Sequence, residues 1–178
     1  TSRGTILIRA VPRSRHRGDA GRPPGGGIEL AIGMLARRPL SEGEVALRLA
    51  RKGVAEGEIP AVLSRLRELG LLEDAALCGR LARSYLEDRR YGPAKIAWKL
   101  ASRRFSRDLV EEALREVASP GAVAEAAAIA LRKKFREGFP QGREGAAKAY
   151  RFLAGRGFPP DACRAAVGRG RTELSQGD

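Results

Sequence analysis

The chain is poor in the residues from which most catalytic and metal sites are built. Its 178 residues include one histidine and two cysteines, and no Cys/His cluster has metal-ligand spacing. The triplet Gly25-Gly26-Gly27 is not followed by the Gly-Lys-Ser/Thr of a phosphate loop. Carboxylates are common but alternate with arginines at helical pair spacing, which is typical of a solvated face. We therefore predict a protein that acts by binding, without a cofactor, and not an enzyme.

Long apolar runs are also missing. No stretch approaches the roughly 18 residues of a membrane span, and we expect no signal peptide. We therefore expect a cytoplasmic protein with no membrane partner. Cys78 and Cys163 lie far apart among helical apolar residues, so we interpret both as small core side chains in a reducing compartment.

What the sequence does contain is an internal repeat. The segment Arg89–Leu114 matches Ser41–Leu63 after a shift that brings Ile96 onto Val45, and Gly145–Val167 after a shift that brings Ile96 onto Ala149. Apolar residues occupy the same five columns in all three copies. In the middle copy these are Ile96, Leu100, Phe105, Val110 and Leu114. A fixed period with matching core columns indicates stacked repeats.

Helix signals divide each copy into three helices. Pro93 fits the first helical position, Ser41 and Glu44 form a capping box, and Ser106 and Asp74 fit N-caps. We predict an all-α protein in which three tandem three-helix repeats form an elongated, curved body behind a mostly unstructured basic N-terminal arm. The predicted segments are an arm at 1–27, repeats at 28–73, 74–119 and 120–170, and a tail at 171–178.

The predicted arm is rich in Arg, Gly and Pro. Residues 10–27 fit a mobile linker, and the β-branched run Thr5–Ile8 fits a lone strand or a short ordered piece. His16 is the only histidine and lies in this basic segment, so we assign it neither a catalytic nor a metal-binding role.

Positive charge is unevenly distributed along the chain. The net charge is +13, yet residues 35–74 carry seven basic and seven acidic side chains, while residues 80–104 and 129–156 each carry eight basic and two acidic ones. Residues 107–128 reverse the balance, with two basic and five acidic. An anionic partner contacted by the second and third repeats explains this segregation. The alternative explanation for the excess of basic residues is that they keep the protein soluble and that the genome is rich in arginine codons.

The positions of these basic residues around each predicted helix indicate which of them could contact a partner. Lys95, Lys99 and Arg103 follow one another at i, i+4 and i+8 and are predicted to form an outward stripe. The predicted partner-binding residues are Arg80, Arg83, Arg89, Arg90, Lys95, Lys99 and Arg103 in the second repeat and Arg132, Lys133, Lys134, Arg136 and Lys148 in the third. Trp98 fits a stacking platform for bases, but it shares a column with Leu47, so we predict that it is partly buried in the core.

An ordered series of motifs resembles the RecX family over roughly Leu30 to Val167. The motifs are Met34–Arg38, Ser41–Glu44, Leu49–Gly53, Leu69–Asp74, Arg90–Ile96 and Phe152–Phe158. The chain departs from the family at Leu77, where an aromatic is usual, and at Cys78, where alanine is usual. Arg104 stands where glycine is usual, and because a left-handed arginine costs about 1 kcal/mol relative to glycine, we expect that turn to be built differently.

The resemblance implies a bacterial regulator of the RecA recombinase. RecX proteins are curved, three-repeat helical molecules that lodge in the groove of the RecA–DNA filament, inhibit its ATP hydrolysis and strand exchange, and limit the SOS response. The implied partners are the RecA filament and the DNA phosphates within or beside it, with the chain acting as a monomer. A stacked-repeat body with segregated basic residues agrees with such a groove.

Two alternatives remain open from the sequence. The chain is alternatively a helical protein that binds DNA directly and acts without RecA, although no helix stands out as a recognition helix rich in Asn, Gln and Arg. A weaker possibility is that only the basic arm, from Arg3 to Arg22, binds acidic surfaces while the repeats serve as a scaffold.

Overall fold

The computed structural model describes residues 26–175, with side chains described as far as residue 170. Thr5–Ile8, His16 and most of the predicted arm therefore lie outside the described residues. Within the described part, nine helices form three consecutive triplets and no strand is present. The helices are α1 (Gly26–Leu35), α2 (Glu42–Arg51), α3 (Ile59–Glu68), α4 (Asp74–Glu87), α5 (Pro93–Ser102), α6 (Arg107–Val117), α7 (Pro120–Lys134), α8 (Gly142–Gly155) and α9 (Pro160–Ser175).

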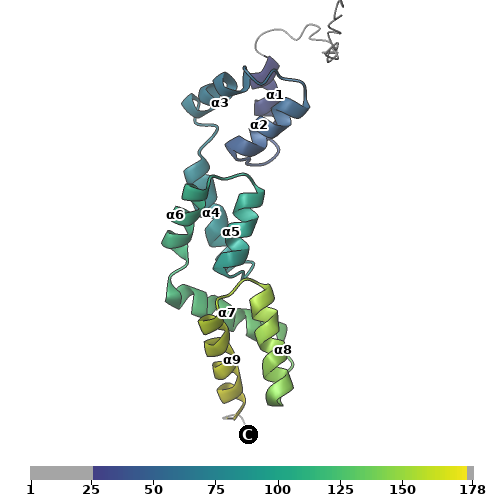
Figure 1. Cartoon of the computed structure of the whole chain (residues 1–178), viewed down its shortest axis with the longest axis vertical. Helices are drawn as coiled ribbons and strands as arrows, with labels where there is room; N and C mark the ends of the chain where they lie inside the picture. The colour runs from purple at the N-terminus through teal and green to yellow at the C-terminus, as the bar shows by residue number, and fades with distance from the viewer. Residues whose placement is uncertain (1–25, 176–178) are drawn as a thin grey trace, which may run out of the picture.

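The three triplets follow one another along the long axis of the molecule (Figure 1). The middle helices α2, α5 and α8 form one column along the molecule. The last helix of each triplet, α3, α6 or α9, lies to the left of that column in this view. We refer to α1–α3, α4–α6 and α7–α9 as the first, second and third repeats. The predicted class, an elongated all-α body of three tandem three-helix repeats, is confirmed.

Four of the five repeated apolar columns are buried in the core, and the fifth, which consists of Leu63, Leu114 and Val167, is partly buried against it. Ile96 and Leu100 on α5 are fully buried, as are their counterparts on α2 and α8, which are Val45, Leu49, Ala149 and Leu153. Residues four apart lie on one face of a helix, so each middle helix turns the same stripe toward its own repeat. The interpretation of Cys78 and Cys163 as core side chains is also confirmed, because both are completely buried free thiols.

The buried residues form two separate clusters. Leu49, Leu66 and their neighbours make a core that belongs to the first repeat alone. A second core runs through both the second and the third repeats, and α4 packs against α7 across their boundary. Within the described residues, no helix of the first repeat packs as extensively on a helix of the second. The second and third repeats are thus one packed body, and the first is attached to it by other means.

Two helix ends differ from the sequence-based expectation. α1 begins at Gly26, inside the segment predicted as the arm, and Gly27 packs against Val62. α9 continues to Ser175, inside the segment predicted as the tail. Gly170 allows α9 to pass close to the Phe139 ring, where a Cβ would lie 2.8 Å from a ring carbon. Gly170 thus permits close packing and does not stop the helix.

The turn after α5 is built like its counterparts, so the expectation for Arg104 was wrong. Arg104 has φ +63°, and the equivalent Gly53 and Gly157 both have φ +81°. The repeat geometry imposes the left-handed conformation on whichever residue stands there, and here a side chain accepts the strain.

Replacing Arg104 by glycine should therefore stabilise the protein. We expect Arg104→Gly to raise the free energy of unfolding by about 1 kcal/mol, the cost of a left-handed side chain. The matched control is Gly53→Arg, which should lower it by a similar amount because Gly53 has φ +81° and open space around it. Urea denaturation measures both. A loss of stability in Arg104→Gly would mean that contacts of the arginine outweigh its backbone strain.

The separate cores should make unfolding occur in two steps. Leu49→Ala leaves a cavity in the core of the first repeat only and should destabilise that repeat by about 2–5 kcal/mol. Hydrogen exchange should then accelerate in α1–α3 while α4–α9 keep their protection. Leu153→Ala, in the shared core, should accelerate exchange in both the second and the third repeats. Equal acceleration in all nine helices by either variant would show a single cooperative unit.

Candidate functional site

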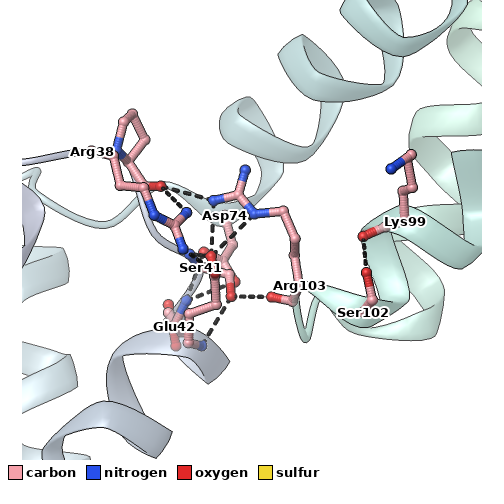
Figure 2. A network of polar contacts seen from close by, with 9 residues as sticks. Arg38, Ser41, Glu42, Asp74, Lys99, Ser102 and Arg103 are labelled. Atoms are coloured by element: carbon pink, nitrogen blue, oxygen red, sulfur yellow. Dashed lines mark hydrogen bonds and ion pairs between the residues drawn. The ribbon is translucent and has the colours of Figure 1, made fainter. Parts of the chain in front are cut away.

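The first and second repeats are joined by polar contacts at the end of α5 (Figure 2). The hydroxyl of Ser41 donates to the Arg103 carbonyl, so the N-cap residue of α2 meets the C-cap residue of α5. The Arg103 guanidinium donates to the carbonyl of Pro39 at 2.8 Å and to Glu44 Oε2 at 2.8 Å. We call this contact the first joint. It satisfies groups that helix ends otherwise leave unpaired.

The first joint corrects two sequence-based assignments. Arg103 is not part of an outward stripe, because its side chain is only 18% exposed and is paired with Glu44. Asp74 does not cap its own helix: α4 has Glu73 at the N-cap position without a side-chain cap, and the Asp74 carboxylate accepts from the Glu42 N–H at 3.0 Å. Asp74 therefore caps α2 from the next repeat, which only the tertiary structure brings within reach.

Burial and hydrogen bonding at the first joint shift the pKa values of two carboxyl groups in opposite directions. Burial alone would raise the pKa of Glu44, but hydrogen bonds from Arg38, Arg103 and the Ser41 backbone N–H hold that pKa below its usual value. Burial raises the pKa of Asp74, a shift opposed by the hydrogen bond from Glu42 and reinforced by the charges of Glu42 and Glu44. Glu44 is thus the anion around which the joint is assembled.

A second joint repeats this arrangement between the second and third repeats. Arg156 is the C-cap residue of α8, and its carbonyl accepts from the N–H of Gly92, the N-cap residue of α5, at 2.9 Å. The Arg156 guanidinium donates to the Arg89 carbonyl at 2.8 Å. A Cβ on Gly92 would collide with the Gly157 carbonyl. Glycine is required at position 92 because two backbones touch there.

Basic side chains gather in a cleft of about 270 Å³ beside the second joint. We call it the basic cleft. It is lined by Asp88, Arg89, Arg90, Ala130, Lys133, Lys134, Phe152 and Arg156. These residues come from the α4–α5 connection, from α7 and from the end of α8, so the cleft exists only because the second and third repeats are packed together.

The cations of the basic cleft are not neutralised by acidic side chains. Within the described residues, none of Arg89, Arg90, Lys133 and Lys134 forms an ion pair. The one carboxylate that lines the cleft, Asp88, accepts a hydrogen bond from the Ser84 hydroxyl. Cations that outnumber the one carboxylate beside them and form no ion pair attract an anion such as a phosphate or a carboxylate.

The remaining predicted contacts are scattered. Arg83 pairs with Glu116 and Arg132 with Glu125, so part of their charge is neutralised within the chain. Five other predicted contacts lie elsewhere. Arg80 borders an apolar groove between the first and second repeats, and Arg136 borders a groove between α7 and α9. Lys148 is exposed on α8, and Lys95 and Lys99 lie on α5. The structure brings Arg89, Arg90, Lys133 and Lys134 together in the basic cleft, and it places Lys95 and Lys99 together against one ring on α5.

Aromatic rings accompany the cations on this part of the surface. Lys99 Nζ lies 5.3 Å from the centroid of Tyr91, and Arg156 Cζ lies 5.5 Å from the same ring. Arg156 Cζ is also 4.9 Å from the centroid of Phe152. The prediction for Trp98 was wrong, because its side chain is 60% exposed beside Lys95. Cation–ring contacts of this kind are attractive, and each contributes roughly 0.5–1 kcal/mol at an exposed site.

Sequence reasoning missed Arg156 and Phe152. Arg156 occupies the same repeat position as Arg103, a signal that was present in the sequence, since the two repeats align without a gap there. Phe152 precedes the core residue Leu153 and gave no signal of its own, because its role depends on the neighbouring α7.

Neither thiol nor metal chemistry is supported by the described residues. Burial raises the pKa of the Cys78 thiol to about 11 and also raises that of Cys163, so both remain protonated at neutral pH. Between residues 26 and 175 no group of three His, Cys, Asp or Glu side chains is placed to hold a metal ion. No helix in the same range is long and apolar enough to cross a membrane.

Neutralising Glu44 should loosen the first joint in a pH-dependent manner. We expect Glu44→Gln to lower the free energy of unfolding at pH 7 by roughly 1–3 kcal/mol, the range for hydrogen bonds to a charged group. The folded-state pKa is lowered, so this stabilisation is present above the ordinary glutamate value of roughly 4.3 and is lost as the pH falls through the folded-state value.

Denaturant titrations of both proteins between pH 7 and pH 3 test this expectation, and the two curves should converge at low pH. The control is Glu68→Gln, whose ion pair with Arg65 is exposed and should contribute little. A constant difference between Glu44→Gln and the parent at all pH values would show that the Glu44 charge does not hold the joint.

Comparisons with known proteins agree with the repeat architecture. Three family models match in order: the first three-helix domain of RecX at residues 28–66, the second at residues 74–114 and the third at residues 123–167. The crystal structure of RecX from Lactobacillus salivarius superposes with a TM-score of 0.71 at 19% identity, covering 83% of this chain and 96% of that chain, and shows the same fold.

Curated relatives carry the name regulatory protein RecX. The relative from Halorhodospira halophila is 36% identical over 139 residues, which cover 78% of this chain and 84% of the relative. A relative from Thermus thermophilus is 38% identical over 134 residues, which cover 74% of this chain and 83% of the relative. With all three repeats matched in order and at this identity, the chain belongs to the RecX family of regulatory proteins.

Proposed function

We propose that this protein regulates the RecA recombinase by binding in the groove of the RecA–DNA filament, where it inhibits ATP hydrolysis and strand exchange. Family membership supports a regulatory role. The elongated body supports binding along a filament, because stacked repeats present an extended surface to one partner. Acting in this way, the protein is a cytoplasmic monomer, has no catalytic residues and modulates recombination and the SOS response.

The basic cleft is the observation that carries the proposal. Its unpaired cations Arg89, Arg90, Lys133 and Lys134 come from two repeats that share one core, so their spacing is fixed before a partner arrives. A preorganised cationic surface loses little conformational entropy on binding. The filament groove offers matching anions, namely acidic protein surface and DNA phosphates.

The structure also refines the proposed contact residues. Arg103 is already paired in the first joint, and Arg83 and Arg132 are paired on the surface. We assign the main contact to the basic cleft together with Lys95 and Lys99, and subsidiary contacts to Arg80, Arg136 and Lys148. A direct DNA-binding function remains the alternative, since the same cations would attract free DNA.

Titration against the cognate RecA should distinguish the two functions. We expect DNA-stimulated ATP hydrolysis to fall at protein concentrations well below those that coat bare DNA, because the filament supplies contacts that DNA lacks. A parallel DNA-binding assay without RecA measures the protein concentration that coats bare DNA, which is compared with the concentration that inhibits ATP hydrolysis. Inhibition that appears only once the DNA is saturated would mean competition for DNA and would remove the filament-directed mechanism.

Charge reversal should locate the contact. We expect Lys133→Glu combined with Lys134→Glu to raise the concentration needed for half-maximal inhibition at least tenfold, since two desolvated charge contacts become repulsions. The matched control is Arg51→Glu with Arg115→Glu, an equal change in charge at exposed, unpaired positions on α2 and α6. Equal loss in both double variants would indicate a general charge effect and no role for the cleft.

A further inference from the structure

Trp98 is the feature that the function so far leaves unexplained. It is the only tryptophan in the chain, and its side chain is 60% exposed on α5. Beside it, an apolar groove of about 450 Å³ runs between α5 and α6 along Ala101, Phe105 and Val110. An exposed large aromatic residue next to an apolar groove is typical of a surface that binds another molecule.

Cations lie against the Trp98 ring. Lys95 Nζ is 4.6 Å from its centroid and Lys99 Nζ is 5.9 Å from it. Among the described residues neither lysine forms an ion pair, and in Figure 2 the Lys99 ammonium takes no part in the first joint. The ring and two free positive charges are therefore presented together.

The cation–ring contacts continue to the basic cleft. Lys99 links Trp98 to Tyr91, Arg156 links Tyr91 to Phe152, and Lys134 Nζ lies 6.0 Å from the Phe152 centroid. Arg156, Phe152 and Lys134 also line the basic cleft. Rings and cations thus alternate from α5 to α7 across the second joint. We call this surface the aromatic strip: Trp98, Lys95, Lys99, Tyr91, Arg156, Phe152 and Lys134.

We propose that the aromatic strip binds single-stranded nucleic acid, with a base stacked on Trp98 and the backbone phosphates following the lysines into the basic cleft. A single strand offers what the strip lacks, which is flat rings for stacking and phosphates for the unpaired cations. A duplex hides its bases, and an acidic polypeptide supplies charge without the rings. This inference adds a binding site to the proposed function. It rests on that function only for the identity of the strand in the cell, which would be the DNA within the filament.

Fluorescence of Trp98 tests the proposal without RecA, so its outcome is independent of the filament mechanism. We expect a dT oligonucleotide to quench the fluorescence of the full chain at low salt, and a duplex of the same length or poly-glutamate to leave it nearly unchanged. A matching rU oligonucleotide decides between DNA and RNA as the preferred strand. Equal quenching by the duplex or by poly-glutamate would overturn the assignment in favour of a general polyanion site.

Variants read by anisotropy of a labelled dT oligonucleotide locate the base. Trp98→Ala should weaken binding roughly tenfold to a hundredfold, and Trp98→Phe should retain most of it, because stacking needs a ring. Lys134→Ala should reduce the slope of log K against log salt by roughly 0.7, the value for one lost phosphate contact on a single strand. The control Arg115→Ala should change neither.

Unchanged affinity in Trp98→Ala would reject the stacking site even if the oligonucleotide binds. If the chain inhibits RecA but fails to bind the oligonucleotide, the proposed function stands and the inference about the strip is wrong. If the oligonucleotide binds as expected while RecA is unaffected, the strip is a nucleic-acid site and the filament mechanism is wrong.

Discussion

The end-to-end contact between middle helices is the constraint on which the rest of the molecule depends. The last turn of an α-helix leaves carbonyls without partners and the first turn leaves N–H groups. In the first joint the C-cap carbonyl of α5 lies at Ser41, the N-cap residue of α2. In the second joint the C-cap carbonyl of α8 lies at Gly92, the N-cap residue of α5. Opposite ends of two helix dipoles meet, which is also favourable. The column of α2, α5 and α8 follows from this contact (Figure 1).

The two joints share a plan but differ in what reinforces them. The second joint is backed by a core that runs through both of its repeats, whereas the first depends on Glu44, Arg38 and Arg103. Polar contacts specify an orientation but contribute less stability than a continuous apolar core. The shared core of the second and third repeats therefore holds the backbone around the basic cleft, whereas the first repeat is attached mainly through charged and polar groups.

The positive charge that a repeat carries differs from the positive charge that it leaves unpaired. Arg103 and Arg156 stand at the same position in successive repeats, and both are used to clamp the preceding chain by its carbonyls. The cations left unpaired lie next to rings or next to one another, at Lys99 and at Lys133 and Lys134. Repulsion among such cations costs folding energy, and an anionic partner would relieve it.

The sequence by itself determined the helices, the repeat and the core columns, because these depend on local propensity and on a period that can be read directly. Ile96 and its counterparts were found in this way. It failed for Asp74 and Arg103, whose partners lie in another repeat. It also failed for Trp98, because a repeat column does not tell which of its members a neighbouring helix covers. Only the tertiary structure decided which helix ends meet and which cations have no carboxylate partner. Both depend on distances between residues that are far apart in the chain.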